Sequence, residues 1–181
     1  MTFLRDLPDD AVLLDVFRRY PEASGPLIAY HEILLRGESP LSVAERELIA
    51  AYVSGLNACT YCHGVHSVTA EAFGIEEGTL QLLLDDIETA PVADKMKPLL
   101  RYVKKLTHLP ARLTRADADA VYAAGWDDRA LHDAISVCAL FNFMNRLVEG
   151  IGVTGDAGYF QVSGKRLREG GYAGLLGLLG K

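Results

Sequence analysis

Two cysteines and a histidine in the segment 57–66, Asn-Ala-Cys-Thr-Tyr-Cys-His-Gly-Val-His, have the residue types and the spacing for thiol chemistry. The segment contains two of the three cysteines and two of the five histidines of the 181-residue chain. On an α-helix, which turns by about 100° per residue, Cys59, Cys62 and His66 fall within about 60° of one another. Two thiols and one imidazole on a single helix face suit redox chemistry or metal binding.

The helix that must position these side chains is expected to begin near Ala58, with Asn57 as its N-cap. Apolar residues continue at helical spacing to Phe73, and Gly74 supplies a stop signal. The cysteines are therefore expected near the positive end of the helix dipole. That location lowers the pKa of a thiol and favours the nucleophilic thiolate.

Metal and haem sites are the alternatives for the same residues. Two cysteines at this spacing form half of a zinc site, to which His63 or His66 adds a ligand, but one short helix cannot easily surround the ion. No second Cys-x-x-Cys and no His-x-x-x-His exists in the sequence. The run 59–63 also matches the attachment pattern of c-type haem, which normally requires export. We rank zinc and then haem below redox chemistry, and we expect neither a metal nor a cofactor.

The composition indicates a folded protein that does not bind nucleic acid. Half of the residues are hydrophobic, and the formal net charge is −6 with a pI near 5.3. Lysines and arginines are scattered, and their densest group, between residues 95 and 105, has the spacing of a solvated helix face. No run approaches the roughly 18 apolar residues of a membrane span, and no signal peptide is visible, so we expect no membrane partner. We expect a cytoplasmic protein that keeps its three cysteines reduced.

Hydrophobic periodicity and capping signals predict an all-α fold of about eight helices. Ser42 and Glu45 form a capping box that opens one of them. Pro21 is expected to close the first helix. The expected helices span residues 9–19, 26–35, 42–56, 58–73, 76–86, 92–109, 118–124 and 128–149.

One domain is expected over residues 1–181, because a chain of this length buries roughly 70% of its unfolded surface in a single core. The core is expected over about residues 26–153. The tail at 150–181 is rich in glycine and is expected to become ordered only by packing against a neighbour. Because the chain has more apolar helix faces than one core needs, we expect a homo-oligomer.

A longer pattern that includes the cysteines resembles a known family. The pattern is Glu47, eleven further residues, and then Cys59-x-x-Cys62-x-x-x-His66. It is similar to the active-site signature of the alkyl hydroperoxidase D / carboxymuconolactone decarboxylase family. The dipeptide at 61–62 and the segment 141–146 resemble the peroxidase-related branch of that family. The resemblance covers about residues 26–153 and implies an all-α fold, trimers or hexamers, and thiol-dependent reduction of hydroperoxides.

The resemblance also implies a role for each residue of the pattern. Cys62 attacks the peroxide and becomes a sulfenic acid, with which Cys59 condenses to form a disulfide. His66 and Glu47 share the tasks of ionising the attacking thiol and protonating the leaving oxygen. Tyr61 stands where some family peroxidases carry a histidine, so the proton relay is expected to differ from theirs. The decarboxylase branch lacks the cysteine pair, which argues against decarboxylation here.

The leading hypothesis is therefore a dithiol peroxidase that acts on organic hydroperoxides or hydrogen peroxide. Its expected partners are the hydroperoxide substrate, a dithiol reductant (a protein or a lipoyl donor) and further copies of the chain. A redox adaptor that passes electrons from a dihydrolipoyl or thioredoxin-like donor to a partner peroxidase is the second hypothesis. A scaffold oligomer with regulatory cysteines is the third.

Other chemically capable residues are expected to be structural. Cys138 lies among apolar residues and is expected to be a buried small hydrophobe. Three isolated histidines are expected to be surface or capping residues: His31, His108 and His132. Three polar residues of the 141–146 segment are left outside the site: Asn142, Asn145 and Arg146.

Overall fold

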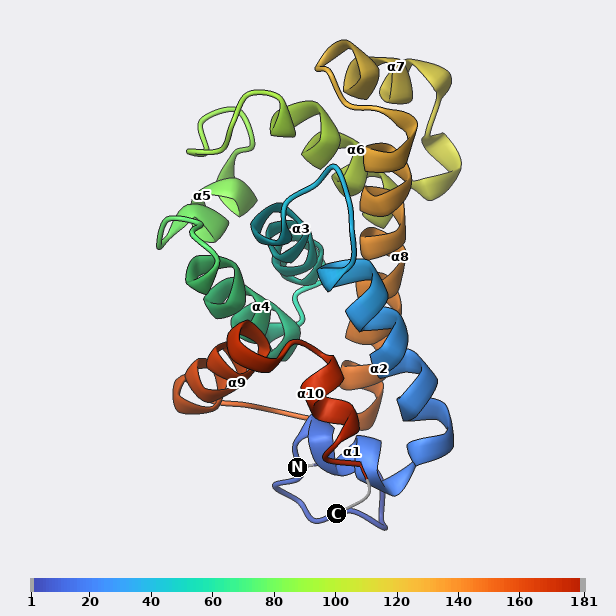
Figure 1. Ribbon diagram of the computed structural model, residues 1–181, viewed down its shortest axis with the longest axis vertical. Helices are drawn as coiled ribbons and strands as arrows, with labels where there is room; N and C mark the ends of the chain where they lie inside the picture. The colour runs from blue at the N-terminus through green and yellow to red at the C-terminus, as the bar shows by residue number, and fades with distance from the viewer. Residues whose placement is uncertain (1, 180–181) are drawn as a thin grey trace.

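Helix α3 (Val43–Leu56) occupies the centre of the fold (Figure 1). All nine of its residues from 46 to 54 are buried, because other helices cover it on every side. Its N-terminus has the expected capping box, in which the Glu45 backbone N–H donates to the Ser42 hydroxyl at 3.2 Å. The Ser42 N–H donates to the Glu45 carboxylate at 2.8 Å. The central helix therefore starts where its sequence predicts.

The computed structural model describes residues 2–179, and over that range it contains ten α-helices and no β-strand. This confirms the all-α class, with more helices than the eight expected. Pro21 does not close a helix but occupies the first position of α2, where its missing N–H costs nothing. The remaining elements are α1 (Leu13–Arg19), α2 (Pro21–Arg36), α4 (Thr60–Ala72), α5 (Thr79–Asp85), α6 (Met96–His108), a 3₁₀ turn η1 (Pro110–Arg112), α7 (Arg115–Ala123), α8 (Asp128–Ile151), α9 (Ala157–Gly170) and α10 (Ala173–Leu176).

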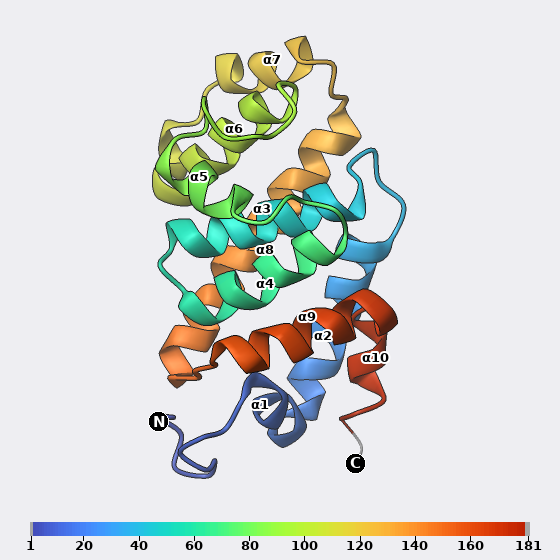
Figure 2. The ribbon, with the colours of Figure 1, turned by 90° about the vertical axis from the view of Figure 1, so that its left-hand side faces the viewer.

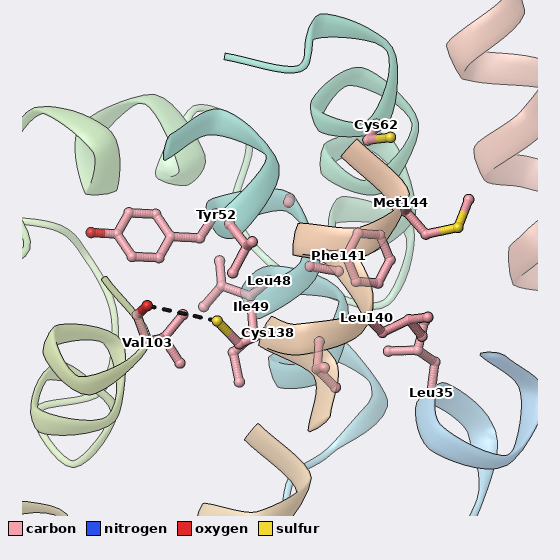
Figure 3. Packing of buried hydrophobic residues seen from close by; sticks show 14 of the residues in the cluster. Leu35, Leu48, Ile49, Tyr52, Cys62, Val103, Cys138, Leu140, Phe141 and Met144 are labelled. Carbon is pink, nitrogen blue, oxygen red and sulfur yellow. Dashed lines mark hydrogen bonds between the residues drawn. The ribbon is translucent and has the colours of Figure 1, made fainter. Parts of the chain in front are cut away.

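The 24-residue helix α8 packs against α3 and α6 and extends along much of the molecule, from below α7 toward α1 (Figure 1). It is long and apolar enough to cross a bilayer, but half of its most apolar stretch is buried inside this fold, as in the core helices of globular domains. Cys138 lies on its buried face, as expected, and its thiol donates to the Val103 carbonyl at 3.7 Å (Figure 3). Burial raises the pKa of this thiol.

The glycine-rich tail is ordered by its own chain, contrary to the expectation that it needs a neighbour. Helix α9 packs along α4, and α10 packs against α2 (Figure 2). The close approach of α9 to α4 depends on Gly64, because a Cβ at that position would overlap the ring of Phe160. Apart from Lys181 and Gly180, which lie outside the described residues, the tail is thus part of the fold and places side chains against α4.

Candidate active site

The turn between α3 and α4 sets the position of the cysteine pair. Asn57 ends α3 instead of capping α4, because its side-chain amide donates to the oxygens of Asn142 (3.1 Å) and Asn145 (2.9 Å) on α8. Ala58 adopts φ 54°, a left-handed conformation that is uncommon for a residue with a Cβ. Cys59 is therefore the N-cap, and α4 begins one residue after it. Such a strained residue persists only where surrounding contacts fix it. Here those contacts are the hydrogen bonds of the preceding Asn57 with α8.

The two thiols of the pair have different surroundings. Cys59 has no exposed surface, and its backbone N–H donates to the Ser54 carbonyl at 2.9 Å. Cys62 lies one turn along the helix and is 4% exposed. A hydrogen bond from the Cys62 thiol lowers the pKa of Cys59, against the effect of burial, whereas the same contact and burial raise the pKa of Cys62 well above its ordinary value. The low thiol pKa expected at this helix end is thus found for Cys59 and not for Cys62.

Glu47 and His66 are in direct contact, as their expected shared role requires. The His66 Nδ1 lies 2.7 Å from Glu47 Oε2, and the carboxylate has no exposed surface. Because an ionised carboxylate only accepts hydrogen bonds, Nδ1 carries the proton and Nε2 of a neutral ring is left as a base. Burial opposes ionisation of Glu47, but the contacts with His66 and Arg36 outweigh it and lower the pKa of this carboxyl.

Two further partners of Glu47 were not foreseen from the sequence. Arg36, the last residue of α2, donates from Nη1 to Glu47 Oε1 at 2.6 Å. The Tyr172 hydroxyl donates to the same oxygen at 3.1 Å, and the Arg36 guanidinium lies 4.9 Å from the centre of the Tyr172 ring. Burial raises the pKa of Tyr172 well above its ordinary value, so it remains a donor. The carboxylate is thus held by an arginine, a histidine and a tyrosine from three different helical segments.

A glycine of the tail places Tyr172 on this cluster. Gly171 has φ 59°, which favours glycine, and a Cβ there would lie 2.7 Å from a carboxylate oxygen of Glu32. That same carboxylate accepts the backbone N–H groups of Tyr172 (2.7 Å) and Ala173 (2.9 Å) at the start of α10. The glycines that suggested a loosely ordered tail therefore include one that the site geometry requires.

Cys62 and His66 border a pocket with an empty volume of about 700 Å³, part of it open to solvent. His31 also borders it and is buried, so the expectation of a surface or capping residue is wrong for this histidine. Its Nδ1–H donates to the Leu27 carbonyl at 2.8 Å, and burial lowers its pKa to about 4, which leaves the ring neutral. Apolar side chains form most of the wall: Leu13, Leu14, Phe17, Ile28, Val65, Phe141, Met144, Leu167 and Leu175.

Two tyrosines line the pocket beside Cys62. The hydroxyls of Tyr61 and Tyr159 lie 2.6 Å apart, so one phenol donates to the other. Burial and the neighbouring phenol raise the pKa of Tyr61, which therefore stays protonated. Tyr61, which lies between the cysteines on α4, and Tyr159 on α9 thus together place phenol hydroxyls in the wall of the pocket.

The remaining candidates are structural. His63 turns away from the pocket toward α3, and its Nδ1–H donates to the Ala51 carbonyl at 2.9 Å. Asn145 is buried and donates to the Ser54 hydroxyl at 2.9 Å, and its contact with Cys62 favours the ionised thiol. It therefore positions the cysteine turn, a role not assigned to it from the sequence. His108 and His132 are exposed, as expected.

Part of the chain matches one known family model. Residues 21–105, which include Arg36, Glu47, both cysteines and His66, match the model described as "Carboxymuconolactone decarboxylase family". This match agrees with the family expected from the cysteine pattern. No curated protein matches the chain.

Solved structures with the same fold include two bacterial peroxidase-related proteins. One, an uncharacterized peroxidase-related protein from Silicibacter sp. TM1040, is 28% identical with a TM-score of 0.76, covering 82% of this chain and 78% of that one. The other, described as an alkylhydroperoxidase AhpD core from Ralstonia eutropha JMP134, is 22% identical with a TM-score of 0.75, covering 83% and 78%. A protein of unknown function from Agrobacterium tumefaciens, described as a candidate antioxidant defence protein AhpD, is 19% identical with a TM-score of 0.67, covering 81% and 99%.

Proposed function

Because residues 21–105 match the model of the carboxymuconolactone decarboxylase family, we propose that this chain is a thiol-dependent peroxidase of the alkyl hydroperoxidase D type. One observation carries the proposal. Cys62 borders an apolar pocket together with His66, whose ring is held by the buried carboxylate of Glu47 at 2.7 Å. A nucleophile and an oriented base thus face the same cavity, which is the arrangement that activates a weak nucleophile.

The first chemical step is attack of Cys62 on the terminal oxygen of the hydroperoxide. Because burial and the contact with Cys59 raise the pKa of Cys62, its ionisation needs a base in the pocket, and His66 Nε2 accepts the proton. The Glu47 carboxylate stabilises the imidazolium that results. As the O–O bond breaks, the imidazolium returns the proton to the leaving oxygen. The products are an alcohol (water from hydrogen peroxide) and the sulfenic acid of Cys62.

Resolution then uses the second thiol. Cys59 attacks the sulfenic sulfur, a disulfide forms, and water leaves. A dithiol reductant, a protein or a lipoyl group, restores both thiols by exchange. We expect this cycle to run in a reducing compartment such as the cytoplasm.

The test is oxidation of the reduced protein by cumene hydroperoxide and by hydrogen peroxide, followed by single-turnover thiol loss. We expect wild type to lose two thiols per chain, with Cys59 and Cys62 joined and Cys138 free by peptide mapping. Cys62→Ser should lose peroxide consumption, whereas the matched control Cys138→Ser should keep it. Peroxide consumption that survives in Cys62→Ser, or Cys138 in the major disulfide, would contradict the proposal.

The raised pKa of Cys62 also supports a second candidate function, a redox adaptor with little turnover of its own. In that case the dithiol passes electrons from a dihydrolipoyl or thioredoxin-like donor to a partner peroxidase. The two functions separate in the same experiment. An adaptor is oxidised slowly by peroxide alone and rapidly by an oxidised partner protein.

A homo-oligomer, trimer or hexamer, is part of the proposal. Apolar side chains remain exposed on the outer faces of α2 and α8, including Ile33 at 70% and Phe143 at 53%. Light scattering at micromolar concentration measures the assembly directly. A monomer under those conditions would contradict this part of the proposal and leave the chemistry of the site untouched.

A further inference from the structure

The pocket beside Cys62 has one charged side chain in its wall. Among the lining side chains of residues 2–179, Arg166 on α9 is the only arginine, lysine or carboxylate. Within that range its guanidinium has neither an ion-pair partner nor a hydrogen-bond partner, although it is half-buried. An arginine at an apolar cavity without a partner in the chain is suited to bind an anion from outside it, since its fork of N–H donors matches a carboxylate.

A buried hydroxyl lies beside it. Ser163 precedes Arg166 by three residues on α9, so the two side chains share one face of the helix, and both border the pocket. Ser163 is 6% exposed, and its hydroxyl has no hydrogen-bond partner in the described part of the chain. A buried unpaired hydroxyl costs free energy that a ligand oxygen would recover. The pocket therefore contains an unfilled donor pair, one charged and one neutral.

The donor pair of Ser163 and Arg166 lies farther along α9 than the residue of that helix that is close to Cys62. Tyr159, whose hydroxyl contacts Tyr61 next to Cys62, precedes Ser163 by four residues and Arg166 by seven, which corresponds to about 6 and 10 Å of helix axis. The walls of the same cavity are mainly apolar. An occupant that contacts both ends thus needs an anionic group, an apolar body, and a reactive group roughly 6 to 10 Å from the anion.

We propose that the pocket selects hydroperoxides of long-chain carboxylic acids, with the carboxylate bound by Arg166 and Ser163 and the peroxide presented to Cys62. The substrate assignment rests on the proposed peroxidase function, but the carboxylate site itself does not. The reaction is the one given above: Cys62 takes the terminal oxygen, the acid leaves as the hydroxy acid, and a dithiol reduces the disulfide.

The kinetic test compares the 9-hydroperoxide of linoleic acid with its methyl ester, which keeps the peroxide and the chain but lacks the charge. Arg166→Gln should raise KM for the acid about tenfold, leave kcat unchanged, and leave both constants for the ester unchanged. Ser163→Ala should raise the same KM by a smaller factor. Lys165→Gln is the matched control, because it removes an exposed positive charge from the adjacent position on the same helix. Equal KM values for acid and ester in the wild type would overturn the proposal.

Binding of decanoate to the reduced protein, measured by calorimetry, separates this proposal from the function on which it rests. Decanoate binding that weakens about tenfold in Arg166→Gln supports the carboxylate site even if no peroxide is consumed, in which case the peroxidase function fails alone. Turnover of cumene hydroperoxide without decanoate binding would rule out the carboxylate site and would still support the peroxidase function. Decanoate binding that Arg166→Gln and Lys165→Gln weaken equally also overturns the site, because it indicates attraction by net charge only.

Discussion

Two buried carboxylates in this chain each contact an arginine and a histidine, but only one of them, Glu47, has a histidine partner that borders the pocket of Cys62. Glu47 contacts Arg36 and His66, which are 11 and 19 residues away. Asp133 contacts Arg129 at 2.9 Å and His132 at 3.2 Å, both on its own helix. The same three residue types thus form one cluster by tertiary folding and another by local helix geometry.

The two clusters differ in their solvent exposure. The His66 side chain is 10% exposed and that of His132 is 73% exposed, although both carboxylates are almost fully buried. Water around Asp133 screens its charges, whereas the contacts of Glu47 act at low dielectric and are correspondingly stronger. Residue types therefore do not decide which cluster can carry chemistry. Burial of the partners and contact with the pocket that contains Cys62 do.

The largest effect is expected from Glu47→Gln. Removing this charge leaves Arg36 largely buried without its partner, so the free energy of unfolding should fall by about 3 kcal/mol. Single-turnover oxidation of Cys62 should slow by roughly 10²-fold or more, because His66 loses the group that stabilises its protonated form. Urea unfolding and stopped-flow thiol loss measure the two effects. A variant that folds and reacts at the wild-type rate would show that Glu47 is an ordinary buried glutamate.

His66→Ala should slow peroxide reduction by a similar factor, with a smaller loss of stability. If the two residues form one relay, the double variant Glu47→Gln/His66→Ala should be hardly slower than either single variant. Rates that multiply in the double variant would instead assign them independent roles. In that outcome the oriented base of the proposed mechanism is wrong, while thiol attack by Cys62 still stands.

Capping and periodicity signals made the helices predictable, and the pattern from Glu47 to His66 pointed to part of the site. The capping box at Ser42 and Glu45 fixes the start of the central helix from within four residues, and the structure has it. The resemblance of the pattern from Glu47 to His66 to a family signature marked the carboxylate, and it does contact His66. Both inferences needed only neighbouring helices, since α4 follows α3 directly.

The rest of the site depends on contacts that no local pattern encodes. Tyr172 lies 125 residues after Glu47, in a tail that was expected to become ordered only by packing against a neighbour. Its position depends on the left-handed backbone at Gly171 and on Glu32, neither of which is recognisable without the fold. Asn57 has the residue type of an N-cap but bonds to α8, so tertiary contacts override its local preference.

The buried histidine His31, which borders the pocket of Cys62, predicts a pH response of the stability. His31, which packs on Tyr172, has a pKa lowered to about 4 by burial, from 6.5 in an exposed ring. Between pH 6.5 and 4 the unfolded chain binds a proton that the folded chain does not, so stability falls as the pH falls, by about 3 kcal/mol in total. Below about pH 4.5, protonation of Glu47, whose folded pKa is lowered, adds a loss of the same sign.

Urea unfolding at several pH values tests this response. His31→Gln should flatten the profile between pH 6.5 and 4. The control is His108→Gln, which replaces an exposed histidine whose side chain makes no hydrogen bond or ion pair within residues 2–179. The same slope in His31→Gln as in wild type would assign the loss to other groups. Burial of His31 would then make no separate contribution to the pH dependence of the free energy of unfolding.

Tyr172→Phe should have a moderate effect. The substitution removes one of three donors to Glu47 and leaves Arg36 and His66 in place, so we expect a loss of about 1 kcal/mol in stability and a few-fold slower thiol oxidation. Tyr122→Phe is the matched control, since its hydroxyl donates at 2.7 Å to the exposed carboxylate of Asp128. Equal losses in the two variants would mean that burial adds nothing to the phenol–carboxylate contact.

The smallest effect is expected from Asp133→Asn, and it is the one that decides whether the comparison holds. Its arginine partner is exposed and its histidine partner is solvated, so loss of the charge should lower the free energy of unfolding by no more than about 1 kcal/mol. Peroxide reduction should be unchanged, because no residue of this cluster borders the pocket that contains Cys62. The measurement is the same pair of assays used for Glu47→Gln, at equal protein concentration. If Asp133→Asn slowed thiol oxidation as much as Glu47→Gln, a general loss of stability would explain both results. Glu47 would then have no specific role in the reaction.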